Sequence, residues 1–149
     1  NIPIIHGHGV CTDDFITTAG AAAEGMEMPC SAVIIAEDVA SDHPQKPVFM
    51  NFKWHYTEYT GQPVSTLGGH GWDGLMWVLD ALKSLPDGLT LEEQRAAVRD
   101  YLETKIVNWP GTAGVFTLSA TDHYGLTPAS FTWFKVQGGK WVPFPEEQW

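Results

Sequence analysis

The opening of the chain gathers side chains that could do chemistry: His6, His8, Cys11, Asp13 and Asp14. A thiol beside an imidazole can act as a nucleophile pair, and imidazoles with carboxylates can hold a catalytic metal. Both reactions also need an oxyanion site or further clustered ligands, and no recognisable serine or zinc hydrolase motif occurs. A Cys/His or metal-dependent hydrolase therefore stays an alternative. We expect a protein that is not an enzyme, with no catalytic residue, no metal and no cofactor.

These side chains follow an apolar stretch. Residues 2–5 are isoleucine apart from one proline, which predicts a strand buried on both faces, as in parallel sheets. Residues 15–23 predict a helix, with capping groups just before it. In open α/β sheets, the loops that follow such strands line the ligand crevice. We therefore expect Gly7, His8 and Gly9 to bind a ligand.

A second candidate region is the start of a helix predicted over residues 66–84. Four glycines between positions 68 and 74 each disfavour the helix, by about 1 kcal/mol relative to alanine. Close packing against a neighbouring backbone would explain Gly74, whereas residues 68–71 could leave room for a ligand. His70 and Trp72 lie beside that gap. We expect both to bind the ligand, with Trp72 either a core residue or a stacking wall.

The remaining pattern mixes helices with strands. An extended segment is predicted at 26–36, helices at 47–60 and 90–104, a short strand at 115–119, and a hairpin of 130–136 and 140–144. The apolar faces expected on the three long helices are Val48, Phe52, Tyr56 and Tyr59; Leu75, Met76, Val78, Leu79 and Leu82; and Leu91, Ala97, Val98, Tyr101 and Leu102. This mixture predicts an α/β fold.

Composition narrows the possible partners. The 149 residues are 44% hydrophobic and carry a net charge of −10, which fits a globular domain and disfavours nucleic acid or an anionic membrane as a partner. No apolar run is long enough to span a bilayer, and no signal peptide opens the chain. A start at Asn1, directly before a buried strand, leads us to expect an internal fragment of a longer protein. Cys11 and Cys30 allow either one disulfide or two buried thiols.

The order of motifs resembles the C-terminal part of the type I periplasmic binding proteins of the leucine/isoleucine/valine-binding (branched-chain amino acid) family. The resemblance covers nearly the whole chain, and no single motif carries it alone. The matching stretches are Ile4-Ile5-His6-Gly7-His8-Gly9, residues 19–25, residues 52–61, Trp72-Asp73-Gly74, residues 111–116, Asp122-His123-Tyr124-Gly125-Leu126 and Gly138-Gly139-Lys140-Trp141.

The resemblance implies two Rossmann-like α/β lobes that close on a solute about a hinge. Residues 1–30 would form a strand-loop-helix unit of the second lobe, residues 31–112 mainly first-lobe helices, and residues 113–149 the last crossover and the hairpin. It further implies export to the periplasm and delivery of the solute to the permease subunits of an ABC transporter. A chain cut in this way is expected to self-associate through exposed edges and apolar helix faces.

His8 stands where amino-acid binders of this family place a carboxylate that holds the ligand's ammonium group. An imidazole can instead donate to a carboxylate, carbonyl or phenolic oxygen. This departure favours an aromatic or other small carboxylate over a branched-chain amino acid. The same lobes also occur in sensing domains of amide- or amino-acid-responsive regulators, which remains the alternative function.

Overall fold

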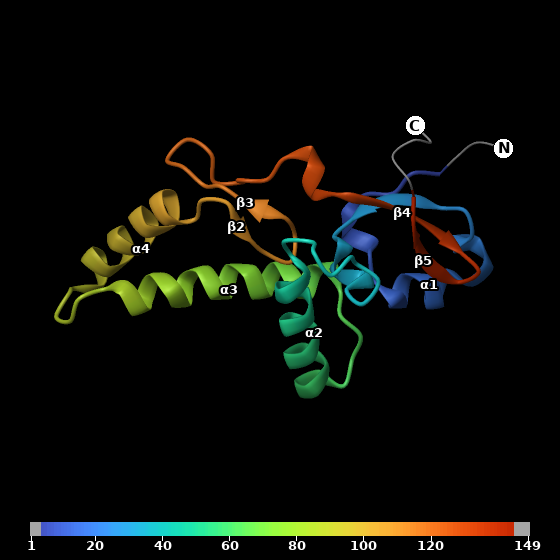
Figure 1. Ribbon diagram of the computed structural model, residues 1–149, viewed down its shortest axis with the longest axis horizontal. Helices are drawn as coiled ribbons and strands as arrows, with labels where there is room; N and C mark the ends of the chain where they lie inside the picture. Colours follow the sequence, from blue (N-terminus) through green and yellow to red (C-terminus); the bar gives the residue numbers. More distant parts are fainter. Residues whose placement is uncertain (1–3, 145–149) are drawn as a thin grey trace.

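The computed structural model describes residues 4–144, and its elements follow one another as helices and strands (Figure 1). The helices are α1 (Asp13–Ala19), α2 (Lys46–Thr60), α3 (Thr66–Ser84) and α4 (Leu91–Lys105), with single 3-10 turns η1 (His8–Val10), η2 (Gly20–Ala23), η3 (Ala32–Ile35) and η4 (Pro128–Ser130). The strands are β1 (Glu27–Cys30), β2 (Trp109–Pro110), β3 (Val115–Phe116), β4 (Thr132–Gln137) and β5 (Lys140–Pro143).

One end of the molecule is a three-stranded antiparallel sheet with α1 beside it (Figure 1). Strand β4 lies in the middle, with β1 and β5 on its two sides. The expected hairpin is confirmed, and its turn uses Gly138 and Gly139 at φ 60° and 70°, a region that glycine adopts without strain. The Glu24 carboxylate accepts hydrogen bonds from both of their N–H groups.

The other end consists of α3, α4 and the short β2–β3 pair (Figure 1). Helix α3 begins at a serine cap, because the Ser65 hydroxyl accepts from the N–H of Gly68. Helix α4 begins at the expected capping box between Thr90 and Glu93. A small core of Ile106, Ala113, Phe116 and Leu118 holds this end together.

Helix α2 crosses α3 between the two ends and projects away from it (Figure 1). It carries Pro47 in its first turn and ends at Gly61, φ 66°, as expected. The prediction that Tyr59 lies on its buried face is wrong, because Tyr59 is 93% exposed. The last turn of α2 extends past its neighbours, so burial is confined to Phe49 and Phe52 earlier in the helix.

Three further expectations were wrong for the described residues. Ile4 and Ile5 are exposed rather than buried, because only Ile5 pairs, through a single parallel bridge to Glu27; residues 2 and 3 lie outside the described part. The extended segment 26–36 ends at Cys30, after which Ser31 caps the 3-10 turn η3. The apolar face of α3 is largely exposed at Leu75, Val78, Leu79 and Leu82, since no described element covers it.

None of the helices within residues 4–144 combines the length and apolarity that a bilayer crossing would need.

Candidate functional site

Two imidazoles from segments far apart in the sequence meet in the structure. His8 belongs to η1 at the sheet end, and His70 belongs to the start of α3. Their Nε2 atoms lie 3.4 Å apart and their ring centroids 4.9 Å apart, although 62 positions separate them in the chain. The ring of Phe131 meets His8 edge-on at 5.8 Å between centroids. Two of the residues singled out from the sequence are thereby brought together, with an aromatic ring beside them.

The environment of this pair favours neutral imidazoles. Burial lowers the pKa of His8 below its ordinary value of 6.5, and the neighbouring His70 lowers it further. Burial also lowers the pKa of His70, while the negative charge of Asp73 opposes that shift. A hydrogen bond between two nitrogen atoms needs one donor and one acceptor, so only one of the two facing Nε2 atoms carries a hydrogen. Such a pair can turn two N–H groups toward an anionic oxygen once it takes up a proton.

Open space surrounds the two glycines of the His8 loop. A Cβ atom added at Gly7 or at Gly9 would meet no described atom within 4 Å apart from the glycine itself and its neighbours in the chain. Gly7 has φ −78°, which any residue adopts, so neither packing nor positive φ demands glycine there. The structure therefore leaves the loop approachable beside His8, and the role of Gly7 and Gly9 at a ligand site stays a prediction.

The glycines of α3 divide into two kinds. A Cβ at Gly69 would collide with the Thr112 side chain, and one at Gly68 would lie 3.2 Å from the Tyr56 ring. Close packing thus explains these two. A Cβ built at Gly71 or at Gly74 would meet no described atom within 4 Å beyond its own chain neighbours and the backbone of α3, so the expected tight packing of Gly74 was wrong.

Trp72 does not join the histidine pair. Its ring packs against Phe52, at 5.6 Å between centroids, and stacks on His55 at 5.7 Å. Positions 70 and 72 lie about 200° apart around a helix, so their side chains leave α3 on different faces. The structure therefore places Trp72 in the contact between α2 and α3, and its role as a stacking wall for the ligand stays a prediction.

Phe131 is the neighbour of His8 that sequence reasoning missed. It lies between η4 and β4, where the pattern predicts only the first strand of the hairpin. Its contact with His8 depends on how the chain returns to the sheet end. Nothing in the local sequence separates it from the other aromatic residues around it.

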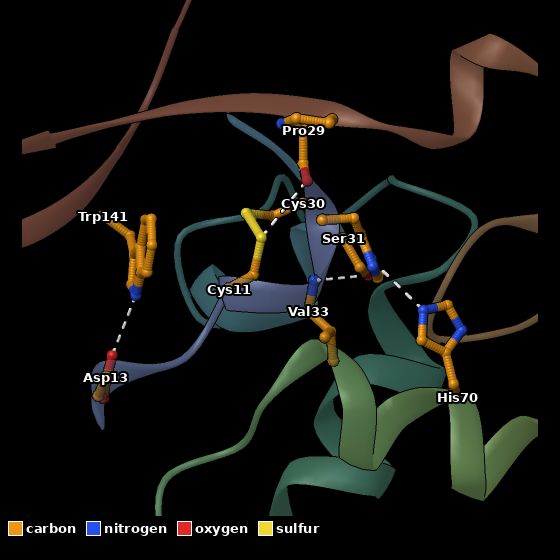
Figure 2. The surroundings of a disulfide bond; sticks show 9 residues. Cys11, Asp13, Pro29, Cys30, Ser31, Val33, His70 and Trp141 are labelled. Carbon is orange, nitrogen blue, oxygen red and sulfur yellow. Dashed lines mark hydrogen bonds between the residues drawn. A yellow bond between two sulfur atoms is a disulfide. The ribbon is translucent and has the colours of Figure 1, made fainter. Parts of the chain in front are cut away.

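Cys11 and Cys30 form a disulfide, which decides between the two states that the sequence left open (Figure 2). The bond joins the segment just after His8 to the last residue of β1. It leaves Cys11 without the thiol that a Cys/His nucleophile pair would need. Within residues 4–144, no three ligating side chains are grouped so that they could hold a metal ion.

Several solved structures share this fold. An extracellular ligand-binding receptor from Rhodopseudomonas palustris is 31% identical, with a TM-score of 0.83, over 97% of this chain and 41% of the receptor. A receptor of the same description from Rhodopseudomonas palustris HaA2 is 29% identical, with a TM-score of 0.83 and the same two coverages. A leucine-binding protein from Thermotoga maritima is 20% identical, with a TM-score of 0.64, over 95% of this chain and 36% of that protein; at this identity it shows the fold alone.

These neighbours confirm the expected type I periplasmic-binding-protein fold. This chain spans about two fifths of the length of the receptors that it matches. No family model matches the chain, and no curated protein matches it.

Proposed function

We propose that this chain is part of the solute-binding component of an ABC transporter, and that it binds a small carboxylate, aromatic or otherwise, between two lobes. The pair formed by His8 and His70 carries the proposal, because it joins imidazoles from two segments far apart in the sequence beside an approachable loop. The names of the neighbours, which are ligand-binding receptors and transporter binding proteins, support a binding role.

The chemistry of the pair favours an acid over an amino acid. A carboxylate oxygen can accept an N–H from each imidazole and stabilise the proton that the pair then takes up. An ammonium group is held best by an acceptor with negative charge, and His8 offers none. Phe131, edge-on to His8, adds an apolar surface that an aromatic ring of the solute can contact.

Closure of two lobes is the proposed mechanism. The pairing of β4 with β1 supports a second lobe built from residues 1–30 together with the hairpin, and the helices of residues 31–112 would belong mainly to the first lobe. A solute that contacts both lobes binds the closed form more tightly than the open form, so it shifts the population toward closure. The closed form would then dock on the permease subunits at the periplasmic side of the membrane.

Calorimetric titration of the intact protein tests this proposal. We expect benzoate to bind and leucine to bind far more weakly, and we expect His8→Gln and His70→Gln each to weaken benzoate binding at least about tenfold, the loss of one charge-assisted hydrogen bond. His55→Gln is the matched control, because His55 is an exposed histidine of α2 that contacts Trp54 and Trp72 instead. Tight leucine binding without acid binding would refute the proposal.

A further inference from the structure

A chain of bonds connects His8 to His70 by a route separate from their own contact. It begins in η1, where the backbone N–H of Cys11 donates to the His8 carbonyl at 3.3 Å. The disulfide then joins Cys11 to Cys30 at the end of β1 (Figure 2). Cys11 and Cys30 are both buried, at 1% and 0% exposure. The segment that carries His8 is therefore covalently attached to the sheet.

The route continues across the middle of the molecule through Ser31. This residue follows Cys30 directly and is 2% exposed. Its hydroxyl donates to the backbone carbonyl of Thr112 and accepts from the N–H of Val33, so both of its hydrogen-bonding functions are used. Thr112 lies 81 positions later in the chain, in the loop between β2 and β3. Ser31 thus fastens the sheet end to the helical end.

Thr112 completes the connection to α3. Its N–H donates to both oxygens of the Asp73 carboxylate, at 2.8 and 2.9 Å, and its hydroxyl donates at 3.0 Å. The N–H of Ala113 donates to the same carboxylate at 3.0 Å. Gly69 lets Thr112 approach the helix, because a Cβ at that position would collide with the threonine side chain. Asp73 lies one helical turn after His70, so this end of the route holds the segment of α3 that carries His70.

We propose that Cys11, Cys30, Ser31, Thr112 and Asp73 are positioning residues that hold the imidazole of His8 against that of His70. This proposal rests on the function proposed above, because it assigns a structural cause to the geometry of the same site. Gly7 and Gly9, on the two sides of His8, face open space, so packing around these glycines does not fix the loop. Restraining it in advance lowers the entropy lost when a solute binds, which strengthens binding.

Variants of the intact protein test the proposal at two points of the route. The double variant Cys11→Ser/Cys30→Ser removes the covalent connection, and Ser31→Ala removes the donor to Thr112. Ser84→Ala is the matched control, because Ser84 also donates to a backbone carbonyl, that of Ala81, but at the far end of α3. Circular dichroism and thermal unfolding establish which variants remain folded.

The readouts are the pKa values of both histidines, followed by NMR without any solute, and the calorimetric affinity for benzoate. Of the described charged groups, His70 acts on His8 and Asp73 acts on His70. Once the rings separate, we expect the pKa of His8 to rise toward its ordinary value. We expect the affinity for benzoate to fall about tenfold, as when a preorganised side chain becomes free. Ser84→Ala should leave both quantities unchanged.

Two results would overturn the proposal. One is a folded double cysteine variant whose His8 pKa and benzoate affinity match those of the unaltered protein. The other is Ser31→Ala behaving as Ser84→Ala does, and this result decides alone if the double variant fails to fold. If benzoate does not bind the unaltered protein at all, the proposed function fails, while the NMR titration still decides whether the route positions the histidines.

Discussion

Asp73→Ala should destabilise the protein much more than the same change at Asp80, which lies on the same helix. Asp73 is 1% exposed, and its carboxylate accepts four hydrogen-bond contacts from three buried donors, which are the N–H and hydroxyl of Thr112 and the N–H of Ala113. Alanine leaves all three donors without this acceptor. Each buried donor left unsatisfied costs about 1 to 3 kcal/mol.

The lower end of that range is the better guide to the expected loss. Burial raises the pKa of Asp73, against the hydrogen bonds that lower it, so the carboxylate itself is unfavourable in this environment and its removal recovers part of the loss. Three donors at the lower value give about 3 kcal/mol. Because folded domains are stable by about 5 to 15 kcal/mol, this loss is a large fraction of the total.

Urea denaturation of the intact protein, followed by circular dichroism, measures this effect. Asp80→Ala is the control, because Asp80 is also on α3 but forms only a surface ion pair with Lys83, at 3.6 Å. Both changes replace aspartate by alanine within the same helix, so their helix-propensity effects cancel in the comparison. A difference below about 1 kcal/mol between the two variants would refute the reasoning.

Three further outcomes are expected. Because the pKa values of His8 and His70 are lowered, both rings are neutral at pH 7.5, and a bound carboxylate raises these pKa values again. The affinity for benzoate should therefore increase as the pH falls toward 6.5. Calorimetry that shows a pH-independent affinity would contradict this. Gly74→Ala should stabilise the protein by up to about 1 kcal/mol in urea titrations. Gly69→Ala should destabilise it, because the added Cβ collides with the Thr112 side chain. The reverse order would be inconsistent with the packing described. The 149-residue chain should self-associate in sedimentation experiments through the exposed apolar face of α3, and Leu82→Arg should shift it toward monomer. Equal sedimentation of the unaltered chain and this variant would show that the face is not the contact.

Much of the secondary structure follows from short-range rules. The capping box of Thr90 and Glu93, the serine cap at Ser65 and the glycine stop at Gly61 each involve residues within four positions of one another. Such contacts form whatever surrounds the helix, so the helix boundaries could be predicted with little information. The family resemblance likewise came from the order of such local motifs, and the neighbours confirm the fold that it implies.

Local patterns were less informative where burial depends on distant segments. The isoleucines at positions 4 and 5 indicate a buried strand, but within the described residues only β1 lies beside them, through one bridge. Apolar residues at 32–35 suggested extended chain, and the Ser31 cap turned them into a 3-10 turn instead. Burial of an apolar side chain requires a partner surface, and no pattern within the segment states whether that surface is present.

By itself, the sequence determined the helices, the hairpin, the α/β class and the candidate loop at His8, because those features depend on neighbours in the chain. Tertiary structure alone decided that His8 meets His70 and Phe131, that Trp72 turns to α2, and that the cysteines are bonded. The pairing of the histidines joins residues 62 positions apart, because the folded chain places η1 beside the start of α3. Contacts of that kind are set by the path of the whole chain, which residue type and spacing do not encode locally.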